Sequence, residues 1–176
     1  MMKRSIGSLL ALLTPFALTF CGDKNNQNLV SPFQNGTVAI LDACDSASFN
    51  AALGAGTCTK AGNVTFSAFT NEFNSTGAVA AWRFDPSTMT LPLGRTITAT
   101  NDGGEVHTFT AVAAFGGGIN PALNGNLVET PECAAITDAD RIAPGASFTT
   151  AALTSSGTHL YQCCIHPWMK TTITVR

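Results

Sequence analysis

Hydrophobic and polar residues alternate in short runs along the chain from residue 63 onward, and clusters of glycine, proline, asparagine and aspartate separate these runs. Short runs of this kind are typical of β-strands, and no amphipathic helical pattern lasts for more than about three turns. About eight strands at this spacing predict an all-β fold, a Greek-key β-sandwich. The predicted strands cover residues 63–70, 79–84, 88–92, 96–101, 107–112, 147–151, 159–163 and 170–175.

The stretch before these strands contains one candidate for a short helix, over residues 45–53. Asp45 and Ser46 are favourable N-cap residues, and Gly54 is a suitable stop. A single short helix near the start of the domain does not change the predicted fold class.

Residues 1–20 have the pattern of a secretory signal peptide, because two basic residues precede an apolar run over residues 6–20. The run is too short for a comfortable membrane span, and no later stretch reaches about 18 uninterrupted apolar residues. Cys21 follows in a context that resembles the lipobox of bacterial lipoproteins, although Phe20 departs from the small residue that is usual there. We therefore expect export to the periplasm or cell envelope of a bacterium. Membrane attachment is expected only through a lipid on Cys21, and the alternative is an ordinary cleavage site near this cysteine.

The rest of the chain suits one domain behind a tether. Residues 21–34 are polar and rich in asparagine, as a flexible tether would be, and residues 35–176 suit a single domain. Hydrophobic residues make up 45% of the chain and charged residues 11%, with a formal net charge of −2. This composition excludes a disordered acidic polymer and a nucleic-acid-binding protein with a basic face.

The candidate chemistry lies in residues 161–169, where Cys163, His166 and Met169 offer a thiolate, an imidazole and a thioether. A thiolate with imidazoles and a weak, long thioether suits copper, whereas oxygen ligands would suit calcium or magnesium. Zinc is the competitor, but zinc sites favour additional cysteine or histidine and rarely use methionine. One ligand is missing from this segment. We assign it to His107, the histidine that opens a β-prone run directly after a glycine-rich turn.

The Cys-x2-His-x2-Met spacing, which ends in His-Pro-Trp-Met at residues 166–169, resembles the ligand loop of amicyanin and related plastocyanin-like cupredoxins. Upstream, residues 84–101 resemble the family strand that leads into the first histidine, and residues 102–109 supply His107. The resemblance covers about residues 79–176. It implies a cupredoxin-like sandwich that holds one type 1 copper ion, with the first histidine on one strand and the other three ligands on a loop between the last two strands. It also implies one-electron transfer as the function.

Three residues depart from the family pattern. Thr108 stands where many relatives carry an asparagine that braces the copper site, and a hydroxyl can take that role. Thr171 stands where a glycine often follows the axial methionine. Cys164 lies one residue too close to His166 for the family spacing, and on a strand its side chain would face opposite to that of Cys163. We therefore assign Cys163 to the metal and leave Cys164 for a disulfide.

Four cysteines then remain for disulfides, and an oxidising compartment permits two such bonds. Four cysteines allow three pairings. We expect Cys44 to pair with Cys58 because the two are close in sequence, and Cys133 to pair with Cys164, which would tie the loop over residues 116–143 to the ligand-bearing strand. The alternative is that one or more of them remain free.

The predicted function is that of an exported one-electron carrier whose redox partner proteins dock near His166 and Trp168. Trp168 could form an apolar rim around the histidine edge or could simply be packed, and His159 is expected on the surface without a metal role. No carboxylate pair, Ser-His-Asp order or phosphate-binding glycine loop indicates an enzyme.

Two alternative functions remain open. One is a periplasmic protein that binds or delivers copper without electron transfer, which exposed clusters of methionine or histidine would indicate; the chain has four methionines and three histidines. The other is a structural cupredoxin fold without metal, which the complete ligand set opposes.

Overall fold

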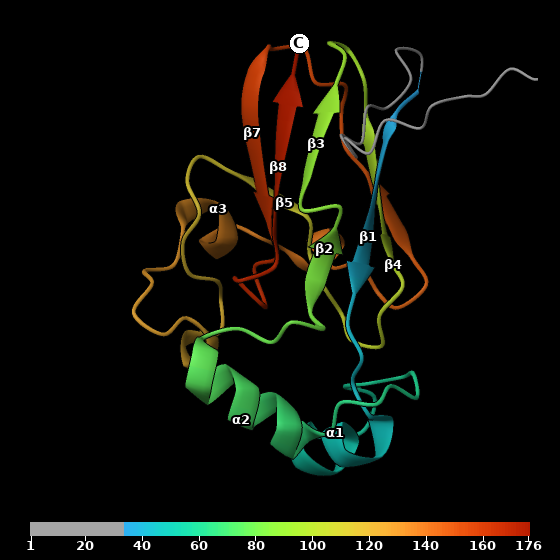
Figure 1. Cartoon of the computed structure of the whole chain (residues 1–176), viewed down its shortest axis with the longest axis vertical. Helices are drawn as coiled ribbons and strands as arrows, with labels where there is room; N and C mark the ends of the chain where they lie inside the picture. Colours follow the sequence, from blue (N-terminus) through green and yellow to red (C-terminus); the bar gives the residue numbers. More distant parts are fainter. Residues whose placement is uncertain (1–33) are drawn as a thin grey trace, which may run out of the picture.

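The computed structural model describes residues 34–176, and within them two four-stranded sheets form the β-sandwich that the sequence predicts (Figure 1). The predictions for the signal peptide, Cys21 and the tether up to residue 33 lie outside the described residues. In spatial order, the first sheet consists of β2 (Arg83–Asp85), β1 (Gly36–Leu41), β4 (Ile97–Asn101) and β6 (Ser147–Thr149), and the second of β3 (Thr88–Leu91), β8 (Lys170–Val175), β7 (Gly157–Gln162) and β5 (Thr110–Val112).

The core lies between the sheets because the strands bury alternate side chains. In β4 the buried residues are Ile97, Ala99 and Asn101, and in β8 Ile173 and Val175 are at most 2% exposed. Residues two apart on a strand point to the same face, so this alternation presents one apolar face to the opposite sheet.

The loop that carries most of the candidate ligands connects two paired strands. β7 and β8 are antiparallel, and their last pair joins Gln162 to Lys170. Residues 163–169 therefore form the connection between these strands, at the end of the sandwich where the helices lie (Figure 1).

Two helices lie between β1 and β2 in sequence, and the first of them confirms the predicted one. α1 (Ser46–Leu53) begins after Asp45, whose carboxylate accepts a hydrogen bond from the Ser48 backbone N–H at 2.9 Å, and ends at Gly54. The short elements of the chain are η1 (Pro121–Leu123), α3 (Pro131–Ala134) and η2 (Asp138–Asp140).

The predicted strand over residues 63–70 is wrong, because most of this segment belongs to α2 (Phe66–Thr76). The Thr65 hydroxyl caps this helix by accepting from the Ala68 backbone N–H at 3.2 Å. Phe66, Phe69 and Phe73 recur with helical spacing, and all three pack against the aromatic residues beneath the helix. Burial of this face outweighs the strand preference of aromatic side chains.

Two other strand predictions need correction, and one strand was missed. β1 was not predicted, although its burial alternates. The strand expected over residues 79–84 is limited to β2, and the one over residues 107–112 begins only at Thr110. His107 instead forms an isolated β-bridge with Ile142.

Both expected disulfides are confirmed. Cys44 and Cys58 have their Cα atoms 6.2 Å apart, and Cys133 and Cys164 have theirs 5.2 Å apart. The first bond packs against Gly104, where an added Cβ would lie 2.7 Å from Cys44 Sγ. It therefore supports the turn that leads to His107.

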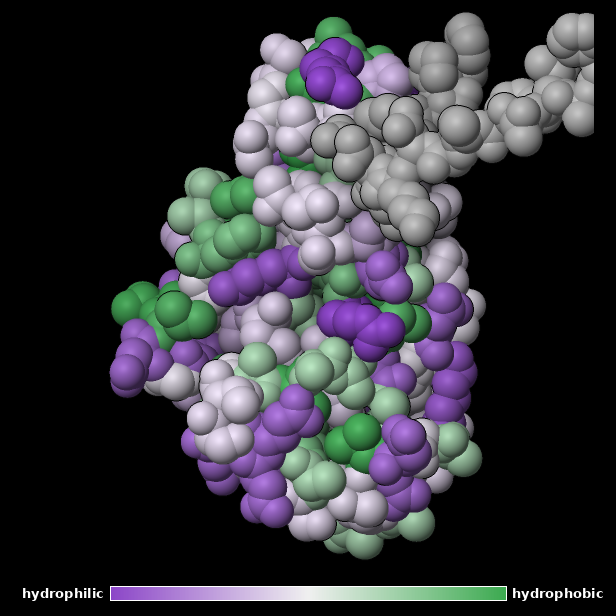
Figure 2. Space-filling view, viewed as in Figure 1, coloured by the Kyte–Doolittle hydropathy of each residue, from purple (hydrophilic) through white to green (hydrophobic). Residues whose placement is uncertain are grey.

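On the face shown in Figure 2, hydrophilic residues are spread over several regions. In residues 34–176, no helix has the length and apolar character needed to cross a membrane.

We predict that the double substitution Cys44→Ala and Cys58→Ala lowers the free energy of unfolding by about 3 kcal/mol, because it frees a short loop in the unfolded chain. Urea unfolding of both proteins, followed by circular dichroism, measures this difference. A loss below about 1 kcal/mol would show that this bond contributes little to the stability of the helical end.

Candidate metal centre

His107, Cys163 and His166 bring one potential ligand atom each to a buried point. Cys163 Sγ lies 3.7 Å from His107 Nδ1 and 4.0 Å from His166 Nδ1, and the two nitrogens are 3.3 Å apart. A circle through atoms with these separations has a radius of about 2.1 Å, which matches the bonds of about 2.0–2.3 Å that nitrogen and sulfur form with a metal such as zinc. One ion at the centre of this triangle would be within bonding distance of all three atoms.

The β7–β8 loop holds two of these ligands and Met169 in a compact arrangement. The Met169 backbone N–H donates to the His166 carbonyl at 2.9 Å, and the Cys163 N–H donates to the Met169 carbonyl at 3.0 Å. The His166 N–H points at Cys163 Sγ at 3.5 Å. Met169 is 1% exposed. The structure thus assembles three of the four predicted ligands and buries the fourth on the same loop, where its role as axial ligand stays a prediction.

Asp42 is the residue at this site that sequence reasoning missed. Its side chain is 1% exposed, and its Oδ2 lies 2.9 Å from His107 Nε2. The same carboxylate accepts from the backbone N–H groups of Cys44, Gly104 and Glu105 at 2.9–3.2 Å. Because a carboxylate can only accept, His107 Nε2 donates to Asp42, and Nδ1 is the nitrogen that faces the cluster.

The glycine-rich turn before His107 is required by this carboxylate. A Cβ on Gly103 would lie 2.0 Å from Asp42 Oδ2. The turn can therefore wrap around Asp42 only because glycine stands at this position.

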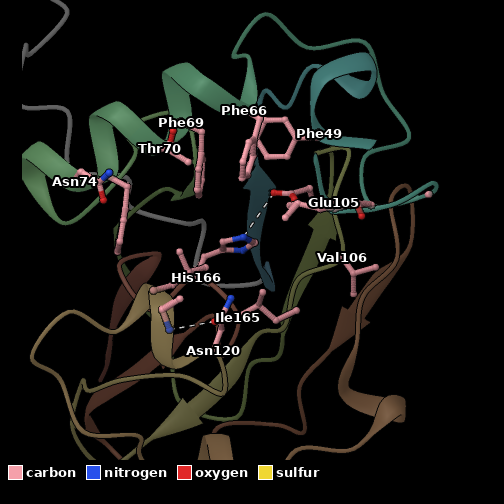
Figure 3. A pocket seen from close by; sticks show the side chains of 16 residues that line it. Phe49, Phe66, Phe69, Thr70, Asn74, Glu105, Val106, Asn120, Ile165 and His166 are labelled. Atoms are coloured by element: carbon pink, nitrogen blue, oxygen red, sulfur yellow. Dashed lines mark hydrogen bonds and ion pairs between the residues drawn. The ribbon is translucent and has the colours of Figure 1, made fainter. Parts of the chain in front are cut away.

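Glu105 lies beside Nε2 of His166, as Asp42 lies beside Nε2 of His107. Its Oε2 accepts from Trp82 Nε1 at 2.6 Å and lies 3.6 Å from His166 Nε2 (Figure 3). Glu105 is 6% exposed, and this burial raises the pKa of its carboxyl group. Trp82, which is 1% exposed in the core, thus also serves as a hydrogen-bond donor.

The close contacts within the cluster shift the pKa values of Asp42, His107 and Cys163 toward their charged forms. Burial would raise the pKa of Asp42, yet hydrogen bonds from His107 and two backbone N–H groups hold that pKa below its usual value. Burial also opposes a charge on His107, but Asp42 and Cys163 raise the pKa of His107 to about 9. Although burial disfavours a thiolate, hydrogen bonds with both imidazoles lower the pKa of Cys163 well below that of a free thiol. The thiolate is the form that binds metal.

Thr108 braces the loop as expected for a hydroxyl in place of asparagine. Its Oγ1 accepts from the Cys164 backbone N–H at 2.8 Å, and the residue is fully buried. Cys164, which we had not assigned to the metal, forms a disulfide with Cys133. Thr171 also has a defined contact, since its hydroxyl donates to the Pro86 carbonyl at 3.0 Å.

Trp168 and His159 lie outside the cluster. The Trp168 ring is 5.2 Å from the Phe73 ring and 6.1 Å from the Phe69 ring, and its Nε1 donates to the Val79 carbonyl at 3.2 Å. Of the two readings of Trp168, the structure shows the packed one. His159 is partly exposed, with Nε2 2.9 Å from the Ser155 carbonyl oxygen.

No protein-family model and no curated protein matches this chain. Among solved structures it is similar to a novel purple cupredoxin from Nitrosopumilus maritimus, with 18% identity, 81% of this chain and all of that chain covered, and a TM-score of 0.44. It is also similar to the oxidised plastocyanin from Dryopteris crassirhizoma, with 18% identity, coverage of 80% and 100%, and a TM-score of 0.41. A reduced amicyanin variant has 19% identity, coverage of 56% and 78%, and a TM-score of 0.38. These likenesses concern the fold alone.

We predict that Asp42→Asn weakens the affinity for Cu²⁺ about 10- to 100-fold, because an amide N–H₂ would face the donors that now surround the carboxylate and His107 would lose its orientation. Competition titration against a copper chelator measures this affinity. Asp85→Asn, an exposed change in β2, is the matched control and should bind as the unmodified chain does. Equal affinity for all three proteins would show that Asp42 does not orient the ligand.

Proposed function

We propose that the chain is a one-electron carrier that holds one type 1 copper ion with His107, Cys163, His166 and Met169. The observation that carries this proposal is the buried triangle of one sulfur and two nitrogen atoms, whose pairwise separations are 3.3–4.0 Å. One thiolate, two imidazoles and a weak thioether are the ligand set of copper electron-transfer sites. When bound, copper supplies a centre that can gain and lose one electron.

The chain's own residues would keep the ligands in place during that exchange. Asp42 holds His107, and Thr108 holds the loop at Cys164. The bond between Cys133 and Cys164 ties the same loop to α3. Ligands with restrained positions rearrange little when the charge at their centre changes, which suits a carrier rather than an enzyme.

We propose that electrons enter and leave the site through His166. It is the cluster residue that also lines a surface pocket, although it is only 4% exposed. We propose that redox partner proteins approach the molecule near His166 and Trp168, over the side chains that cover them.

The disulfides bear on the cellular compartment in which the protein works. Two disulfides suit an oxidising environment. We propose that the carrier works in the periplasm or cell envelope, with attachment through Cys21 as its only link to a membrane.

We predict that Cys163→Ser abolishes the intense visible colour of the copper-loaded protein, because the substitution removes the thiolate that would bind copper and give rise to the colour. Met169→Gln should keep copper bound and coloured but lower its reduction potential, since a harder oxygen donor stabilises the oxidised ion. Absorption spectra and voltammetry test both variants.

The matched control for these variants is the double substitution Cys133→Ala and Cys164→Ser, which removes the neighbouring cysteine without leaving a free thiol. This protein should remain coloured. Intense colour in the Cys163→Ser protein would mean that the wrong cysteine has been assigned to copper.

A further inference from the structure

A pocket of about 510 Å³ lies between the two helices and the β7–β8 loop, directly beside His166 (Figure 3). Its volume is in the range of small-molecule sites, about 300–1,000 Å³. Most of its wall is apolar, and the residues that form this part include Phe49, Phe66, Phe69, Phe73, Leu123 and Ile165.

The helical wall has the geometry to contact a flat ring. Phe66 and Phe69 have ring centroids 6.4 Å apart with planes inclined by 10°, and Phe69 and Phe73 repeat this spacing at 6.4 Å and 8°. A series of nearly parallel rings along one helix offers faces and edges to another aromatic ring, and such contacts contribute beyond the burial of area. This wall favours a planar aromatic ligand.

Glu105 gives the pocket one strong hydrogen-bond acceptor. Its Oε2 is used by Trp82, but among residues 34–176 no group donates a hydrogen bond to its Oε1. A ligand group that donates to this oxygen would meet a carboxyl group that is only 6% exposed and whose other oxygen already accepts from Trp82.

The charge of the lining excludes an anionic ligand. No lysine or arginine is among the described residues that line the pocket, and Glu105 is its only acidic residue. A carboxylate or phosphate would therefore meet an acceptor and apolar rings with no compensating cation.

We propose that this pocket binds a small, neutral, planar aromatic molecule of the phenol class, with its ring against Phe66, Phe69 and Phe73 and its hydroxyl donating to Glu105. The proposal goes beyond the function proposed above and does not require a bound metal. It assigns the His166 edge of the molecule to a small aromatic ligand.

The test uses the full chain, both as purified and after metal removal, titrated calorimetrically with three probes that share one ring. p-Cresol should bind one site in both preparations. 4-Methylanisole, which lacks the donor, should bind about tenfold more weakly, and 4-methylbenzoate should show no binding. Equal affinity for p-cresol and 4-methylanisole, or tightest binding of 4-methylbenzoate, would overturn the proposal.

Two variants locate the binding site. Thr70→Trp places a large side chain in the pocket and should abolish p-cresol binding, whereas Asn71→Trp, the next position on α2 and outside the lining, should preserve it. Unchanged binding by the Thr70→Trp protein, or its loss in both variants, would contradict a ligand at this position. Circular dichroism verifies that both variants are folded.

Glu105→Gln tests the role of the carboxyl group. Because Trp82 engages one oxygen, the amide N–H₂ of the variant would face the pocket. The preference for p-cresol over 4-methylanisole should then disappear. A preference that survives this substitution would show that Glu105 does not accept the hydroxyl.

Discussion

The hydrogen bond between His107 and the buried carboxylate of Asp42 is the contact on which the rest of the site depends. Asp42 follows β1 in one sheet, and His107 precedes β5 in the other, so the bond joins the two halves of the sandwich at the ligand cluster. A buried carboxylate is stable only when it is well paired. The turn at Gly103 and Gly104 meets that need by directing backbone N–H groups at it, and the same turn places His107 with Nδ1 toward Cys163.

The segment between β1 and β2 changes the accessibility of the site. α1 and α2 lie across the end of the sandwich where the β7–β8 loop lies (Figure 1). Their aromatic side chains, with Trp82 and Trp168, form one continuous packed cluster, in which Phe49 stacks on Trp82 at 5.7 Å. This packing leaves His166 almost fully buried, with its side chain among those that line the pocket beside the helix.

The sequence predicted the features that depend on local spacing. β8 alternates cleanly and has the predicted bounds, both expected disulfides form, and His107, Cys163 and His166 lie together. α2 was missed because three phenylalanines suit a strand as well as a helix until their common packing partners are known. Asp42 could not be predicted, since it lies 65 residues from His107 and only the pairing of β1 with its neighbours brings the two together.

The two imidazoles of the cluster are held differently, and this difference would give them separate tasks in the carrier proposed above. His107 is fully buried with its Nε2 fixed by Asp42 at 2.9 Å, and it is not among the residues that line the surface pocket. His166 Nε2 is 3.6 Å from Glu105, beyond a good hydrogen bond, because Trp82 holds the carboxyl group instead. The His107 imidazole is therefore anchored by the buried, fully hydrogen-bonded carboxylate of Asp42. The His166 imidazole lines the pocket instead. If electrons pass through this site, the geometry favours exchange at the His166 side and rigidity at the His107 side.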